Sequence, residues 1–173
     1  MKRYPRQLSY GATNTVLALS ETEVGKLFTD DTRSDIGSES EKMRFANGVN
    51  DLVAKFLRLE RNEDLKADML VMERIYPIDF RAYEVERREL WLDVFDDEMG
   101  QLHQAGFVHH DLRRPTDLGG EPYDNVLLTN QGLRLIDVGI SILRHQVGDA
   151  FFAAYVRQEL AELEEFKEYF LNR

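Results

Sequence analysis

The feature that most constrains the fold of this chain is a short hairpin pattern in its C-terminal half. Two apolar runs with strand character, residues 126–128 and 133–136, flank the polar turn 129–132, which ends in glycine. This pattern is typical of an antiparallel β-hairpin. Asn125 precedes the first run and Asp137 follows the second, so the hairpin brings an amide and a carboxylate to the same open end. We therefore expect two polar side chains that are distant in sequence to lie together.

A third polar residue, Asp111, lies in the loop before this hairpin, in the sequence H-H-D-L-R of residues 109–113. With Asn125 and the D-V-G triplet that begins at Asp137, this loop resembles the protein-kinase motifs H-R-D-L-K, N and D-F-G in their usual order. The match has departures. His110 and Val138 stand where Arg and Phe are common, and thirteen residues separate Asp111 from Asn125 where the family has about four.

This resemblance implies a role for each matching residue. Asp111 would be the catalytic base that orients an acceptor hydroxyl, and Asn125 and Asp137 would bind Mg²⁺. Arg113 would hold the γ-phosphate, as a lysine does in the family, and His109 would pack beneath the D-V-G turn rather than bind a metal. The alternative is that these are ordinary turn residues, since Asn and Asp favour turns.

The N-terminal part reads as strands. Residues 15–19 and 24–28 are β runs around a polar turn, and the second places Lys26 on the same face as two apolar residues. Lys26 resembles the kinase lysine that binds the ATP phosphates. The preceding loop, residues 9–16, would be the phosphate-covering loop, although Gly11 is its single glycine where the family has three.

Residues 39–57 have apolar positions at helical spacing and predict one long amphipathic helix. On that helix Glu41 lies at the edge of the apolar stripe while Glu39 points elsewhere. We therefore expect Glu41, rather than Glu39, to pair with Lys26, as a kinase C-helix glutamate does. The charged stretch 58–66 is predicted to be a turn.

Residues 69–75 predict a buried strand that resembles the kinase hinge, with Met72 in the gatekeeper place and the backbone from Glu73 to Ile75 facing adenine. A helix over residues 84–104 and a last helix over 149–172 follow from their apolar stripes. Asp149 is expected either to cap that last helix or to hold the catalytic-loop backbone.

Composition excludes several other functions. The net charge of −10 argues against nucleic acid or an anionic membrane as the main partner. The chain has no cysteine, so disulfides and thiolate metal sites are absent. No apolar run is long enough to span a bilayer, and no signal peptide is recognisable. We expect a cytoplasmic protein, or a secreted effector without a recognisable signal.

We expect an α+β, protein-kinase-like fold over residues 1–173. It would have two lobes, with a small antiparallel sheet and C-helix in residues 1–75 and a reduced, mostly helical lobe in 76–173. It resembles the minimal kinases of bacterial effectors and mobile elements. The implied activity is ATP- and Mg²⁺-dependent phosphoryl transfer to a hydroxyl, most plausibly of protein Ser/Thr. A pseudokinase that binds nucleotide or protein, and a small-molecule kinase, are the alternatives. A partner protein is expected to provide substrate docking or activation.

Overall fold

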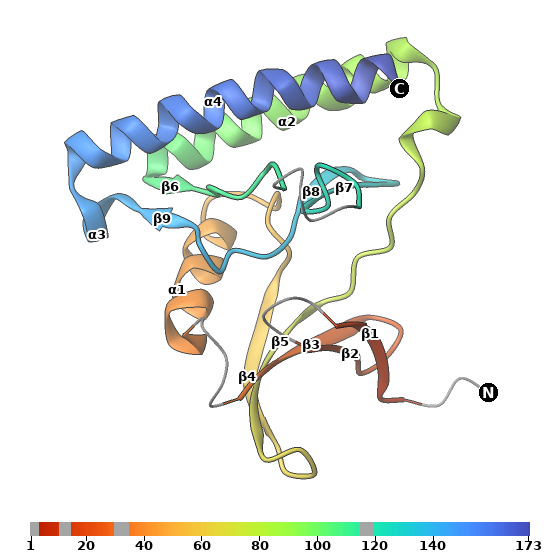
Figure 1. The fold of residues 1–173 in the computed structure, drawn as a ribbon, viewed down its shortest axis with the longest axis vertical. Coiled ribbons are helices and arrows are strands. Elements are labelled where there is room, and N and C mark those ends of the chain that lie inside the picture. Colours follow the sequence, from red (N-terminus) through yellow and green to blue (C-terminus); the bar gives the residue numbers. More distant parts are fainter. Residues whose placement is uncertain (1–3, 11–14, 30–34, 115–119) are drawn as a thin grey trace.

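An antiparallel sheet forms the N-terminal part of the computed structural model, which describes residues 4–10, 15–29, 35–114 and 120–173. Its five strands follow the order β1-β2-β3-β5-β4, so that β3 occupies the centre between β2 and β5 (Figure 1). Lys26 on β3 pairs with Val16 on one side and with Leu70 on the other. The strands are β1 Arg6–Tyr10, β2 Thr15–Ala18, β3 Glu23–Phe28, β4 Phe56–Asn62 and β5 Ala67–Glu73.

The strand β4 corrects the expectation that residues 58–66 form a turn. It is an edge strand paired only with β5 in the described sheet, and residues 57–61 are exposed. Its sequence carries only a short alternation, Leu57-Arg58-Leu59-Glu60, whose leucines stay exposed, and the charged residues around them favour a turn. The predicted turn is limited to the tip of the β4–β5 hairpin.

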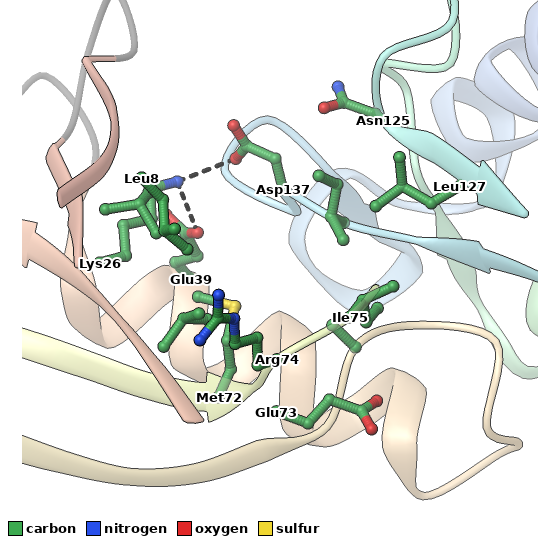
Figure 2. Close-up of a pocket in the computed structure, with 14 residues that line it drawn as sticks. Leu8, Lys26, Glu39, Met72, Glu73, Arg74, Ile75, Asn125, Leu127 and Asp137 are labelled. Atoms are coloured by element: carbon green, nitrogen blue, oxygen red, sulfur yellow. Dashed lines mark hydrogen bonds and ion pairs between the residues drawn. The ribbon is translucent and has the colours of Figure 1, made fainter. Parts of the chain in front are cut away.

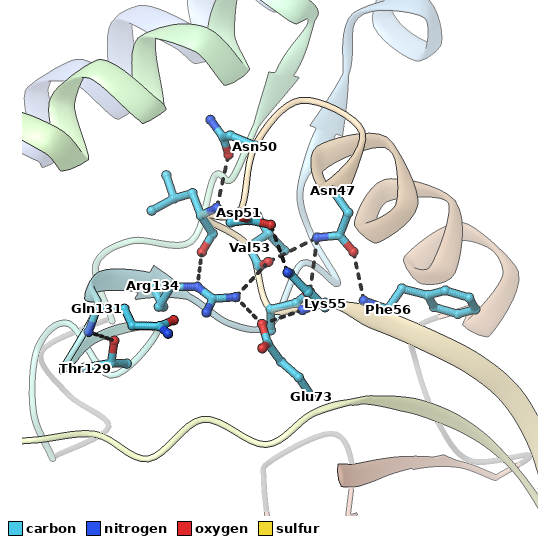
Figure 3. Close-up of polar contacts among 12 residues, drawn as sticks. Asn47, Asn50, Asp51, Val53, Lys55, Phe56, Glu73, Thr129, Gln131 and Arg134 are labelled. Carbon is cyan, nitrogen blue, oxygen red and sulfur yellow. Dashed lines mark hydrogen bonds and ion pairs between the residues drawn. The ribbon is translucent and has the colours of Figure 1, made fainter. Parts of the chain in front are cut away.

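The helix α1, Ile36–Asn47, is shorter than the predicted helix 39–57. Asp35 caps its first turn by accepting a hydrogen bond from the N–H of Ser38. At its other end the Asn47 side chain donates to the carbonyl of Val53 at 3.1 Å and accepts from the N–H of Phe56 at 2.8 Å (Figure 3). These bonds turn the chain away from the helix and into β4.

The segment between α1 and β4 packs against the hairpin strand β8, Gly132–Leu135. The N–H of Ala54 donates to the carbonyl of Leu135, and the N–H of Leu135 donates to the carbonyl of Leu52. Arg134 also reaches the carbonyls of Leu52 and Val53 (Figure 3). Leu52 and Val53 are fully buried by this contact. Their apolar character therefore reflects packing against β8 and not the helix that the sequence pattern predicted.

Two long helices lie side by side over the C-terminal strands (Figure 1). They are α2, Val85–Ala105, and α4, Asp149–Asn172, within about one residue of the predicted helices. Gly106 ends α2 in a left-handed conformation, with φ 111°. None of the described helices is long and apolar enough to cross a membrane.

Short elements precede and connect these helices. The predicted hairpin is confirmed as β7, Val126–Thr129, paired with β8. The other elements are the 3₁₀ turn η1 Phe80–Ala82, β6 Phe107–Val108, β9 Ile142–Leu143 and α3 Arg144–Val147. One buried apolar cluster joins the sheet to the helices, with Leu70 from β5, Met43 from α1, Leu135 from β8, and Phe95 and Phe166 from α2 and α4. This core fixes the sheet relative to the hairpin that carries Asn125 and Asp137.

Candidate active site

A cavity of about 300 Å³ lies between the sheet and the β7–β8 hairpin. Its walls are apolar, with Val16, Val24 and Met72 from the sheet and Leu127 and Ile136 from the hairpin segment. Its polar lining includes Lys26, Glu39, Asn125 and Asp137, and Glu73 and Arg74 lie apart from them (Figure 2). An apolar slot with a few convergent polar groups is the usual form of a small-molecule site.

Lys26 joins two carboxylates at this cavity. Its Nζ donates to Glu39 Oε1 at 2.8 Å and to Asp137 Oδ1 at 2.9 Å (Figure 2). Lys26 is 5% exposed and Glu39 is 1% exposed, so this ion pair is shielded from water. The three residues come from β3, α1 and the end of the β7–β8 hairpin, and the lysine therefore ties three elements together.

The electrostatics of this cluster favour a charged lysine beside a charged Asp137. Burial alone would lower the pKa of Lys26, but the carboxylates of Asp137 and Glu39 raise it above its usual value. Burial opposes ionisation of Asp137, yet Lys26 and the N–H of Gly139 hold the pKa of that carboxyl below its usual range. Burial raises the pKa of Glu39, whose Oε2 has no partner among the described residues.

The prediction that Glu41 pairs with Lys26 is wrong. Glu41 points to His145, 3.2 Å away, and its side chain is about half exposed. The error follows from the helix boundary. The predicted apolar stripe includes residues after Gly48, and these lie outside α1. Including them shifts the predicted buried face of the helix away from Glu39. The buried face of α1 consists of Glu39, Ser40, Lys42, Met43 and Ala46.

Asp111 and Asn125 are in direct contact. The Asn125 Nδ2 donates to the carbonyl oxygen of Asp111 at 2.9 Å and to its Oδ2 at 3.0 Å. The intervening insert closes on itself, because the N–H of Arg114 donates to the carbonyl of Pro122 at 2.7 Å. The thirteen intervening residues therefore leave the contact between Asp111 and Asn125 intact. Burial raises the pKa of Asp111 above its usual value.

The donor set suits a hard cation such as Mg²⁺. Because the Asn125 nitrogen donates to Asp111, its amide oxygen remains available, and it lies on the same side of the cavity as the Asp137 carboxylate (Figure 2). Among the described residues no three His, Cys, Asp or Glu side chains form a metal-binding group of their own. One amide and one carboxylate leave most coordination positions to phosphate oxygens and water, as Mg²⁺ commonly requires.

The remaining predicted site residues are placed as follows. Ile75 lines the cavity, and so does Glu73, although its carboxylate turns to Arg134 and to the N–H of Lys55 (Figures 2 and 3). Arg113 is exposed, pairs with Glu165 on α4 and is not among the residues that line the cavity. Gly11 lies outside the described residues.

His109 is fully buried and its Nε2 bonds to the carbonyl of Ile136 at 2.9 Å, directly before Asp137. The carbonyl of His109 in turn accepts from Ser141 Oγ at 2.9 Å. These bonds join the loop of Asp111 to the turn of Asp137. They agree with the packing role expected for His109.

Glu159 on α4 is a structural residue that the sequence interpretation missed. Its Oε1 accepts from the N–H of His110 at 2.6 Å and its Oε2 bonds His103 Nε2 at 2.7 Å, with Glu159 only 1% exposed. Glu159 therefore holds the backbone next to Asp111, the function considered for Asp149. Gly148 occupies the N-cap of α4 without a side-chain cap, so the capping role of Asp149 is also wrong.

No family model and no curated protein matches this sequence. Among solved structures, the kinase PK-1 of the Cydia pomonella granulovirus superposes with a TM-score of 0.57 at 15% identity. The fold is kinase-like. The superposition covers 80% of this chain and 51% of the viral kinase, so the chain spans about half of that kinase. At this identity the likeness defines the fold and leaves the activity to be argued from the site.

Proposed function

We propose that this protein transfers the γ-phosphoryl group of ATP to the hydroxyl of a protein serine or threonine. The observation that carries the proposal is the meeting of Lys26 with Glu39 and Asp137 at a cavity that Asn125 also lines. Because phosphoryl transfer needs positioning and charge neutralisation more than covalent chemistry, a preformed arrangement of this kind is the main requirement.

The apolar part of the cavity is suited to the adenine ring, between Val24 and Met72 on one wall and Leu127 on the other. The backbone from Glu73 to Ile75 lies beside the cavity, and because the N–H groups of Glu73 and Arg74 already donate to the carbonyls of Lys55 and Thr22, the base would meet the N–H of Ile75. Lys26 would bind the phosphates, since its raised pKa keeps it charged at neutral pH. Asn125 and Asp137 would hold Mg²⁺, which neutralises phosphate charge when it is bound.

Asp111 would orient the acceptor hydroxyl and receive its proton. Its contact with Asn125 places it next to the metal-binding end of the hairpin. Burial raises its pKa toward the range in which a carboxylate acts as an effective base. Arg113 would have to leave Glu165 to reach a γ-phosphate, so its proposed role requires a rotation of its exposed side chain.

A partner protein would supply substrate docking. Only residues 138–148 separate Asp137 from α4, which leaves little chain to form a substrate-binding segment beside Asp111. The partner proposal rests on this short connection and on the charge of −10, which favours a basic partner surface.

The test is transfer of labelled γ-phosphate from Mg²⁺-ATP to the chain itself and to a panel of proteins. Asp137→Ala should abolish transfer, whereas Asp68→Ala, which removes an exposed acid of β5 paired with Arg61, should leave it unchanged. Thermal stabilisation by Mg²⁺-ATP with no transfer would instead assign a pseudokinase. Transfer to a metabolite but to no protein would assign a small-molecule kinase.

A further inference from the structure

The turn that carries Asp137 is held in a conformation that its residues do not favour alone. Asp137 has φ 59°, in the left-handed region that is unfavourable for a residue with a side chain. A conformation of this kind persists only when its surroundings determine it. Lys26 holds the Asp137 side chain on one side of the turn. A second contact is needed to fix the backbone that follows.

Lys42 makes that contact from helix α1. Its Nζ donates to the carbonyl oxygen of Gly139 at 2.8 Å, and the residue is 8% exposed. A charged donor in a largely buried place makes a stronger hydrogen bond than a neutral one. The turn also lies close against α1. A Cβ placed on Gly139 would be 3.5 Å from Glu39 Oε2 and 3.3 Å from Asp137 Oδ1.

Lys42 and Glu39 are three positions apart and lie on the same buried face of α1. Glu39 holds Lys26, which holds the side chain of Asp137, while Lys42 holds the carbonyl two residues later. Helix α1 therefore supports the turn at both ends, directly through Lys42 and indirectly through the Glu39–Lys26 pair. If α1 moved away, the Lys42–Gly139 and Glu39–Lys26 contacts would be lost together.

We propose that Lys42 is a positioning residue that keeps the Asp137–Gly139 turn in its metal-binding conformation and couples that turn to helix α1. The proposal rests on the proposed phosphoryl transfer. It adds that the site is assembled by the chain's own residues, so that a partner would bring substrate rather than arrange the metal ligands. Lys42 does not line the cavity, which separates this role from nucleotide binding.

The experiment compares Lys42→Met, which keeps the aliphatic stem, with Lys42→Arg, which keeps a charged donor. Lys55→Met is the matched control, because Lys55 is half exposed and its amine pairs with the exposed carboxylate of Asp51. Amide hydrogen exchange of residues 138–141 reports the turn without requiring activity. Steady-state phosphoryl transfer, with ATP and Mg²⁺ each varied, reports the function.

We expect Lys42→Met to speed amide exchange in residues 138–141. In the transfer assay it should raise the Mg²⁺ concentration needed for half-maximal activity and lower kcat about 10-fold or more, while KM for ATP stays within about threefold of the wild type. Lys42→Arg should restore most of kcat and of the protection.

The proposal is overturned if Lys42→Met shows the same amide exchange and the same kcat as Lys55→Met. It is also overturned if Lys42→Met and Lys42→Arg lose kcat equally and in proportion to a lowered melting temperature. If the wild-type chain transfers no phosphate, the proposed function fails, and the exchange comparison still decides whether Lys42 holds the turn.

Discussion

Lys26 and Asp137 are 111 positions apart in the sequence, yet the amine of one lies 2.9 Å from the carboxylate of the other. Glu39 completes the cluster from a third element. A buried lysine shared by two carboxylates leaves net negative charge at the cavity, which a bound Mg²⁺ would offset. This arrangement leads to separate predictions for each of its members and for the elements that support it.

Replacing Glu39 with Gln should lower phosphoryl transfer by about 10- to 100-fold, because the phosphate-binding lysine loses the charged group that positions it. Glu41→Gln is the matched control on the same helix and should retain wild-type activity, since Glu41 contacts His145 near the surface. Initial rates at saturating Mg²⁺-ATP measure both. Equal losses in the two variants would exclude the assigned pairing.

Asp111→Asn should reduce kcat by about 10²- to 10⁴-fold while ATP still binds, because the base acts on the acceptor and not on the nucleotide. Single-turnover transfer and equilibrium ATP binding separate the two effects. An Asp111→Asn variant that keeps more than about a tenth of the wild-type kcat would show that this carboxylate is not the base.

The same substitution should change the dependence of stability on pH. Burial raises the pKa of Asp111, so the native state binds its proton more tightly than the unfolded chain does. The stability from this group is therefore present at acidic pH and is lost as pH rises through the native pKa. Relative to wild type, Asp111→Asn should gain stability between acidic and neutral pH in urea unfolding. A constant difference across that range would contradict this assignment.

Glu159→Ala should destabilise the fold by about 2–4 kcal/mol, because it leaves the N–H of His110 and the ring of His103 without their buried partner. Glu168→Ala, an exposed acid on the same helix, is the control and should change stability by less than about 0.5 kcal/mol. Chemical unfolding measures both. Wild-type stability in Glu159→Ala would remove its assigned role in holding the catalytic loop.

Arg134 and Glu73 should be energetically coupled. Their ion pair joins β8 to the end of β5 (Figure 3), with side chains 11% and 26% exposed. A double-mutant cycle with Arg134→Met and Glu73→Gln should give a coupling of about 1–3 kcal/mol in urea unfolding. Additive effects would mean that the pair contributes nothing beyond its separate contacts.

The parts of the fold that were predicted from sequence are those with local signals. The β7–β8 hairpin and helix α2 have an apolar pattern that matches their period, and a glycine stands at the turn or helix end. The edge strand β4 has only the short alternation from Leu57 to Glu60 among charged residues, and both of its faces are exposed. The end of α1 depends on hydrogen bonds between Asn47 and residues beyond the helix, which sequence periodicity does not contain.

The site shows the same division. The order of Lys26, Asp111, Asn125 and Asp137 is visible in the sequence, but their contacts depend on packing across the molecule. Glu159 did leave a signal. On α4, Leu160 is 46% exposed, and the buried position between Val156 and Leu163 is Glu159. A carboxylate at a core position requires a partner, and that requirement would have identified it.

The central claim is that Lys26, Asn125 and Asp137 form one nucleotide and metal site. Calorimetric titration of ATP, with and without Mg²⁺, into the wild type and Asp137→Ala tests it most directly. The account predicts that ATP binds the wild type more tightly with Mg²⁺, and that Asp137→Ala loses this Mg²⁺ effect while remaining folded. Absence of ATP binding by the wild type, or an unchanged Mg²⁺ effect in Asp137→Ala, would contradict it.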